Sequence, residues 1–346
     1  MSISEFRSML QQFADTYLKG AYNKYMQHSD PRSRFQSTQN IYHAAIQSGL
    51  ILAQIPTCDG GTNESLRYGM IMAEELYAVD PSIALTILGT GLGLSPLLLF
   101  GNPAQKKEFL EPFLAKEGTP LANNSTPLSS MSIVIVTRFD IDANPADAFT
   151  IVDDFEMIGH RATSGPHIKF TNLRIPAKNM LCEPGSGAQA VETVFTASTC
   201  MVAAFSIGIM RTAFEKALMF AKSETRNGSH TIVHYQSVSD ILISMKTKLE
   251  TSRGLASRAV ELLESKRSGE LGYLAKIYCS ESAVEVVADA MKVVGVDSYR
   301  ADFGFGQLME NALVLPVFDG GNVGVRRRQV QKLFESEKYD PRISLD

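Results

Sequence analysis

The chain has 346 residues, of which 45% are hydrophobic and 20% are charged, and its formal net charge is −4. This composition is typical of globular proteins and excludes a disordered, collagen-like or disulfide-scaffold chain. No basic stripe alternates with aromatic residues, so we expect no nucleic-acid partner. The four cysteines are far apart and form no CxxC pair, which argues against a zinc site and favours a reducing compartment.

The first 120 residues are predicted to form an all-helical domain. Apolar residues recur at helical spacing over 5–26, 36–53, 64–78, 82–100 and 103–115, with turn residues after each run. Asn102 and Pro103 form a helix start. The uncharged stretches 81–105 and 193–210 approach membrane-spanning length. Glycine and proline interrupt the first stretch, and the second is rich in Ser, Thr and Ala, so we expect buried helices and no membrane partner.

Residues 121–185 are predicted to form a short β-domain, because SIVIVTRFDI, AFTIV and HIKFTNLRI are rich in strand-forming residues. Residues 186–346 return to long amphipathic helices, at about 190–223, 235–266, 270–294, 305–314 and 321–336. Helices of this length predict a C-terminal four-helix bundle. The expected fold class is therefore mainly α (α+β overall), with domains at 1–120, 121–185 and 186–346.

The segment FDGGNVGVRRR carries the strongest chemical signal. Asp319 ends an apolar run and is followed by Gly320, Gly321 and Asn322. We expect Asn322 to cap a helix whose dipole favours an ionised carboxylate nearby, and the glycines to let the backbone approach a flat ligand. If the helix begins near 321, Arg326 turns back toward Asp319, and a held carboxylate beside apolar residues makes a general base. An ordinary helix-capping turn would explain the same pattern. The six histidines form no metal-binding motif, so no metal site is expected.

Several segments resemble the acyl-CoA dehydrogenase superfamily of flavoproteins over about residues 40–340. They are GLILAQIPTCDGG, AEELYAVDPSIAL, FGNPAQKKEFLEPFLAKEGTPLA and FDGGNVGVRRR. The last stands where acyl-CoA dehydrogenases have Glu-Gly-Thr-Asn. Asp in place of Glu, followed by Gly-Gly-Asn, is similar to the form found in fungal nitroalkane oxidases.

The resemblance implies FAD as the cofactor and assigns roles to individual residues. Asp319 matches the catalytic base, Arg326 matches the arginine that positions it, and Ser198 matches a serine that hydrogen-bonds near the flavin and the base. The positions implied to contact FAD are Arg226, Gln236, Gly295, Gly320, Gly321 and Asn322. The first two of these would reach FAD from a neighbouring subunit, and the resemblance implies a homotetramer.

The resemblance also implies a small-molecule substrate, either a nitroalkane or an acyl thioester, from which Asp319 removes a proton. The β region is shorter than in the family, since LANNSTPLSS leads directly into SIVIVTRF, so part of the expected flavin cradle is missing. A catalytically inactive remnant is therefore a third hypothesis. The N-terminal MSISEFRSML has charges where a signal peptide needs an apolar run, and the final ISLD is no peroxisomal address. We expect a cytoplasmic location, with the peroxisome as an alternative.

Overall fold

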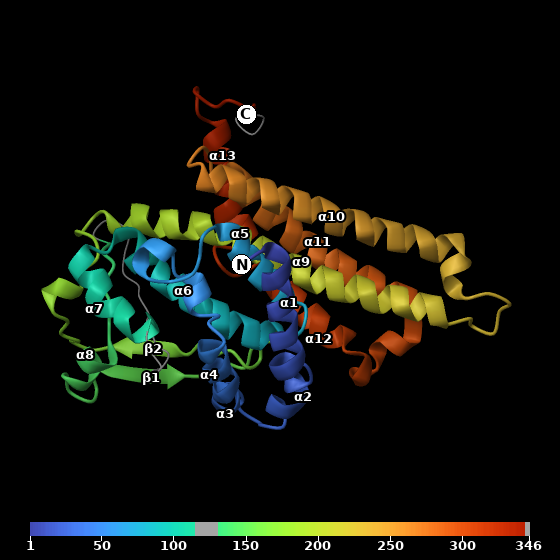
Figure 1. Ribbon diagram of the computed structural model, residues 1–346, viewed down its shortest axis with the longest axis horizontal. Helices are drawn as coiled ribbons and strands as arrows, with labels where there is room; N and C mark the ends of the chain where they lie inside the picture. The colour runs from blue at the N-terminus through green and yellow to red at the C-terminus, as the bar shows by residue number, and fades with distance from the viewer. Residues whose placement is uncertain (115–130, 343–346) are drawn as a thin grey trace.

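The structure is a computed structural model that describes residues 1–114 and 131–342. Its described part is mostly helical, as predicted, with one small sheet beside the N-terminal helices and a bundle of long helices (Figure 1). The N-terminal helices are α1 (Ile3–Phe13), α2 (Ala21–Tyr25), α3 (Pro31–Ser37), α4 (Gln39–Gln47), α5 (Leu66–Tyr77), α6 (Pro81–Phe100) and α7 (Pro103–Leu114).

Two of the N-terminal helices predicted from periodicity are shorter than expected. The predicted helix 5–26 is divided by a π-helical turn, Ala14–Leu18, and by Gly20, which has φ 76°. Only glycine adopts this left-handed conformation without strain, so the chain changes direction there. The predicted helix 36–53 ends at Gln47 in the structure. The predicted start of α7 is confirmed, because Asn102 Oδ1 accepts a hydrogen bond of 2.9 Å from the Gln105 N–H.

The middle region contains a two-stranded antiparallel sheet, β1 (Phe149–Asp153) and β2 (His167–Phe170). The strand predicted over 132–141 is wrong. It makes only an isolated bridge between Val134 and Met180, and then forms the short helix α8 (Arg138–Asp142). Two backbone hydrogen bonds join residues 133–135 to 179–181, and this pairing ends where Thr137 caps the helix. Residues 121–130 of the predicted β-domain, and its boundary at 120, lie outside the described residues.

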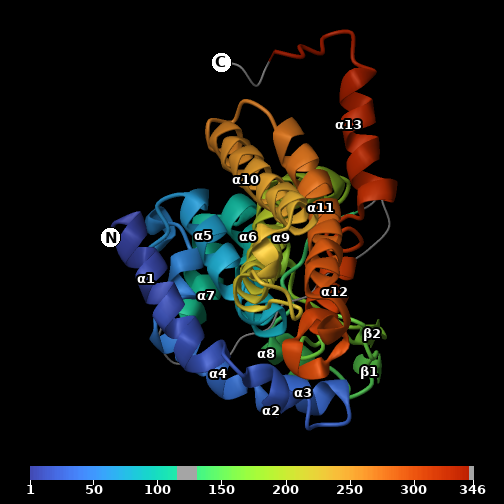
Figure 2. The ribbon, with the colours of Figure 1, turned by 90° about the vertical axis from the view of Figure 1, so that its right-hand side faces the viewer.

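The C-terminal part is the predicted four-helix bundle, formed by α9 (Gly187–Ser223), α10 (Gln236–Glu264), α11 (Glu270–Val294) and α12 (Phe305–Val314). α9 packs against the three other helices, and α11 also contacts α10 and α12. Figure 2 shows α13 (Arg327–Phe334) leaving the bundle toward the C-terminus. The predicted helix 321–336 begins as a π-helical turn, Asn322–Arg326, before α13.

Within the described residues, α6 and α9 are the helices long and apolar enough to span a membrane. The most apolar stretch of α9 is 72% buried, which confirms the expected core helix. The corresponding stretch of α6 is only 33% buried. α6 is therefore less completely buried than expected, although most of its remaining residues are half-buried.

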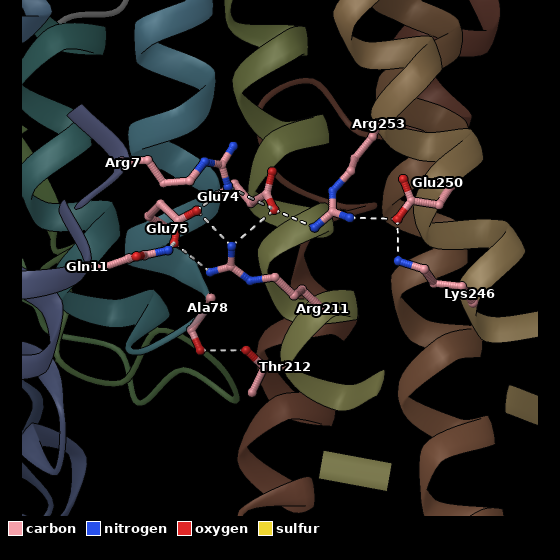
Figure 3. Close-up of polar contacts among 10 residues, drawn as sticks. All are labelled: Arg7, Gln11, Glu74, Glu75, Ala78, Arg211, Thr212, Lys246, Glu250 and Arg253. Atoms are coloured by element: carbon pink, nitrogen blue, oxygen red, sulfur yellow. Dashed lines mark hydrogen bonds and ion pairs between the residues drawn. The ribbon is translucent and has the colours of Figure 1, made fainter. Parts of the chain in front are cut away.

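Ion pairs fasten the N-terminal helices to the bundle (Figure 3). Arg211 of α9 donates hydrogen bonds of 2.8 and 2.9 Å to the Glu75 carboxylate of α5, which Arg7 of α1 also contacts. Arg253 of α10 donates to Glu74 at 2.7 Å. Burial raises the pKa of Glu75, but the Arg211 and Arg7 guanidiniums outweigh burial and hold this pKa below its ordinary value. A side chain with 2% exposure therefore stays charged where four helices meet.

Candidate active site

Asp319 lies in the loop between α12 and the π-helical turn, where the chain reverses direction. Its backbone has φ 53°, and Gly320 follows with φ 72°. A left-handed conformation is costly for a residue with a side chain, and it persists only where the surroundings impose it. The Asp319 carboxylate is 4% exposed, so the loop directs an acid inward against the bundle.

Ser198, in the first half of α9, is the nearest polar neighbour of this acid. The Ser198 hydroxyl lies 2.9 Å from both carboxylate oxygens of Asp319 and donates its hydrogen bond to that carboxylate. Because α9 is a long, buried helix, the hydroxyl is held on a rigid element. The structure thus brings together two of the residues that the sequence singled out.

Arg326 is the second group that holds Asp319. Its side chain is completely buried, and Nη2 donates hydrogen bonds to the backbone carbonyls of Asp319 (2.6 Å) and Phe195 (3.0 Å). The same nitrogen lies 3.4 Å from the Asp319 carboxylate. Arg326 therefore turns back toward the acid, as expected, and fixes the backbone of the loop as well as its charge.

Opposing effects act on the pKa of Asp319. Burial raises this pKa above its ordinary value, while the Arg326 charge, the Ser198 hydrogen bond and the Lys276 charge act in the opposite direction. The net shift is upward. A carboxylate that is buried, oriented and more basic than usual has the properties of a general base.

Lys276 on α11 was not predicted from the sequence to belong to the site. Its side chain is fully buried, and Nζ donates a hydrogen bond of 2.9 Å to Asn322 Oδ1. The prediction that Asn322 caps a helix is therefore wrong. The Asn322 side chain accepts a hydrogen bond from Lys276 and donates one to Ser280, and Gly321 occupies the N-cap position. The available signal was a single lysine on the otherwise apolar face of a long helix.

An aromatic wall of four residues was also missed: Tyr77, His160, Phe205 and Phe318. The rings of Tyr77 and Phe205 stack with centroids 4.0 Å apart, and His160 lies 5.8 Å from Phe318, the neighbour of Asp319 in the chain. Among the described residues, Tyr77 Oη and His160 Nε2 are buried without a hydrogen-bond partner. Burial lowers the pKa of His160 to about 4, so this ring is neutral at pH 7. The wall thus shields one side of the loop from water.

The glycines after Asp319 are explained by close contacts within the chain. A Cβ on Gly320 would lie 3.1 Å from the Arg326 guanidinium, and one on Gly321 would lie 2.9 Å from the Val317 carbonyl. The backbone N–H of Asn322 already donates to the Pro316 carbonyl at 2.8 Å. The contact of Gly320, Gly321 and Asn322 with FAD stays a prediction.

The other predicted FAD residues gather at the far end of α9. Arg226 donates to the Val294 carbonyl at 2.5 Å, and a Cβ on Gly295 would lie 3.3 Å from the Arg226 guanidinium. Gln236 is exposed at the first residue of α10. The helix between Ser198 and Ser223 spans about 37 Å at 1.5 Å per residue. Within one chain, the two groups of residues are therefore well separated.

Two cavities of the described chain lie away from Asp319. One, of about 430 Å³, is lined by Cys58, Asp59, Lys106 and neighbours, and the other, of about 230 Å³, by Asp15, Lys216 and neighbours. Neither includes a predicted site residue. The part of the chain that the structure describes holds no group of His, Cys, Asp and Glu able to bind a metal ion.

Comparison with known sequence families gives two matches. Residues 3–117 match the N-terminal domain of acyl-CoA dehydrogenase, and residues 185–333 match its C-terminal domain. The chain belongs to the acyl-CoA dehydrogenase family. The matched ranges contain the helices of both ends of the chain, including the loop with Asp319.

Within this family, the chain is similar to individual nitroalkane oxidases. Nitroalkane oxidase from Fusarium oxysporum is 38% identical over 413 residues, which cover 97% of this chain and 94% of that protein. Two solved nitroalkane oxidase structures superpose with a TM-score of 0.95, at 37% and 36% identity, and each comparison covers 99% of this chain and 98% of the other. One concerns the roles of an arginine and an aspartate in the reaction of that flavoprotein. The other is an active-site serine-to-alanine mutant crystallized with 1-nitrohexane. The similarity to nitroalkane oxidase expected from the Asp-Gly-Gly-Asn segment is confirmed.

Proposed function

We propose that this chain is an FAD-dependent nitroalkane oxidase whose catalytic base is Asp319. The observation that carries the proposal is the buried Asp319 carboxylate held by Ser198 and Arg326. The similar nitroalkane oxidase has a functional aspartate followed seven positions later by a functional arginine, the spacing of Asp319 and Arg326. Its active site also contains a serine.

In this proposal, Asp319 takes the proton from the carbon that bears the nitro group, and the proton moves onto a carboxylate oxygen. Ser198 and Arg326 orient the carboxylate so that the lone pair faces the substrate, which lowers the entropic cost of proton transfer. The aromatic wall excludes water and strengthens the electrostatic interactions inside the site. Bound FAD would accept two electrons from the deprotonated substrate and pass them to oxygen.

The residues at the far end of α9 fit the phosphate end of FAD. The Arg226 side chain is 44% exposed beside Gly295, which has a φ of 72°, and a guanidinium is well suited to pyrophosphate. Because this end is about 37 Å from Ser198, a cofactor at Asp319 would meet Arg226 only from another copy of the chain. We therefore propose a homo-oligomer, in the form of a homotetramer.

We further propose that the middle domain is shortened. The alignment with the Fusarium protein spans 413 positions, whereas this chain has 346 residues, so that protein has residues at positions this chain leaves empty. The described sheet has two strands and exposes Ile151, Val152 and Phe170. A smaller sheet would leave the ring of bound FAD more open to water.

An acyl thioester is the second candidate substrate, since the family descriptions that match are those of acyl-CoA dehydrogenase. Asp is one methylene shorter than Glu, which retracts the carboxylate by about 1.5 Å. A displacement of about 1 Å can reduce the rate by about 10²-fold. The aspartate therefore favours the nitroalkane.

The test is to purify the full chain with added FAD, record its absorption spectrum, and assay nitroethane and butyryl-CoA side by side. We expect a yellow protein that releases nitrite and hydrogen peroxide from nitroethane. Oxidation of butyryl-CoA without nitrite release would instead establish the acyl thioester reaction. A colourless protein that takes up no FAD would establish the inactive remnant.

A further inference from the structure

We propose that Lys276 is a positioning residue of the site, which ties together the two ends of the Asp319 loop and adds a second positive charge near the carboxylate. The inference deepens the proposed function and rests on it for the reaction. Its structural part concerns the loop itself and is tested separately.

The contacts of Lys276 close the loop. Its ammonium group lies 2.9 Å from Asn322 Oδ1 and 3.5 Å from the Leu315 carbonyl. Leu315 is the residue at which α12 ends, and Asn322 is the first residue of the π-helical turn. One side chain therefore bridges the two ends of the segment that carries Asp319.

The bridge is anchored on α11. Asn322 Nδ2 donates hydrogen bonds to Ser280 Oγ at 3.0 Å and to Glu281 Oε1 at 3.2 Å. Asn322 thus joins Lys276 to two other residues of the same helix. Because Asp319 sits in a strained left-handed conformation, the loop needs such fixed ends to keep the carboxylate at Ser198.

Packing alone does not explain a lysine at this position. A fully buried ammonium group loses its hydration, and two neutral oxygen partners replace only part of it. Methionine would fill a similar volume without that cost. A buried charge near a candidate base, held by neutral oxygens, is instead typical of a functional site.

The Lys276 charge has a measurable effect on the pKa of Asp319. Asp319 faces Arg326 from the π-helical turn, Lys276 from α11 and Tyr77 from α5, and Glu281 also faces Lys276. Burial and the Arg326 charge lower the pKa of Lys276 to about 8, so it is mostly protonated at pH 7. Its positive charge lowers the pKa of Asp319, and loss of that charge moves the Asp319 titration to higher pH.

The experiment compares Lys276→Met, which removes the bridge and the charge, with Lys276→Gln, which removes the charge but keeps a hydrogen-bond donor on a side chain one atom shorter. Lys276→Arg retains both. Lys107→Met removes a charge from an exposed site on α7 and is the matched control. The protonated-carboxyl band in infrared pH-difference spectra of the purified full chain reports the titration, and Asp319→Asn identifies the band.

We expect the Asp319 band to titrate at higher pH in the Met and Gln variants, and near the wild-type midpoint in the Arg and Lys107→Met variants. For nitroethane, we expect kcat/KM to fall by about 10- to 100-fold in Lys276→Met, mostly through kcat, because the carboxylate is displaced. A shifted band in a protein without nitroalkane activity would overturn the proposed function and leave the positioning role intact. If the Met variant does not fold, the titration of the Asp319 band in the Gln variant provides the test. An unshifted band in every folded variant that lacks the charge would overturn the inference.

Discussion

The bundle and the middle region contribute to the proposed site in different ways. In the bundle, α9, α11 and the loop after α12 bury Asp319 and Arg326 and hold both through several hydrogen bonds. In the middle region, the described sheet has two strands, and the exposed fractions of Val152 and Phe170 are 54% and 44%. In the proposed reaction, proton removal would depend on the buried bundle, and cover of the flavin ring would depend on the smaller, more exposed sheet.

The largest expected effect comes from Asp319→Asn. The amide keeps the shape of the side chain and can still accept the Ser198 hydrogen bond, but it cannot take a proton. We expect nitrite release from nitroethane to fall by about 10²- to 10⁴-fold, the usual contribution of a general base. FAD content and the melting temperature serve as controls, and both should stay near wild type. Activity within a few-fold of wild type would remove Asp319 from the mechanism.

The second expected effect concerns the junction between the N-terminal helices and the bundle. Glu75→Ala leaves Arg211, whose side chain is 15% exposed, without its main partner. Arg211 then keeps its 3.2 Å contact with Glu74. We expect a loss of about 3 kcal/mol in the free energy of unfolding, measured by urea denaturation, because removing one partner of a buried ion pair leaves the other incompletely paired.

Glu250→Ala is the matched control for this prediction. Glu250 also pairs with two cations, Lys246 and Arg253, but it is 50% exposed. We expect a loss below about 1 kcal/mol. Equal losses in the Glu75 and Glu250 variants would show that burial of the Arg211 pair adds nothing.

The third prediction is a change in pH dependence. The proposed reaction needs ionised Asp319, so kcat/KM rises as pH increases through the pKa of this group. The Ser198 hydrogen bond lowers that pKa, and Ser198→Ala therefore moves the rising limb to higher pH. We expect about a 10-fold loss at neutral pH, on the scale of one hydrogen bond to a charged group. If Ser198→Ala reduces the activity but leaves the pH of the rising limb of kcat/KM unchanged, the role of Ser198 is limited to binding.

The smallest expected effect lies in the sheet. Val152→Thr changes an exposed side chain to one of similar shape, and we expect the free energy of unfolding to change by less than about 0.5 kcal/mol. Val286→Thr makes the same change at a fully buried position of α11 and should cost about 1–3 kcal/mol. Similar costs at both positions would contradict the contrast between the two regions.

The bounds of α11 and α12 agree with the predicted ranges. α11 repeats its apolar face over 25 residues. α12 has only 10 residues, but it begins directly after Gly304, whose φ is 73°. The strand expected over 132–141 failed since strand formation depends on a partner that is distant in sequence. The break at Gly20 depends on a backbone angle that periodicity does not encode.

The candidate site was predictable where its residues are close in sequence. The spacing of Asp319 and Arg326 was sufficient to expect their contact. Lys276 and Tyr77 are far from Asp319 in the chain, and each looks like part of a core helix. The capping role expected of Asn322 was wrong because the buried ammonium of Lys276 takes its side-chain oxygen. Local sequence rules cannot anticipate a partner from another helix.

Proton removal by Asp319 is tested most directly by mixing the FAD-loaded protein, without oxygen, with nitroethane or with nitroethane deuterated at the carbon next to the nitro group. The rate at which the oxidised-flavin absorbance disappears is the quantity to compare. We expect it to be several-fold slower with deuterium and nearly abolished in Asp319→Asn. Equal rates with both forms of nitroethane, unaffected by the Asn substitution, would contradict the account.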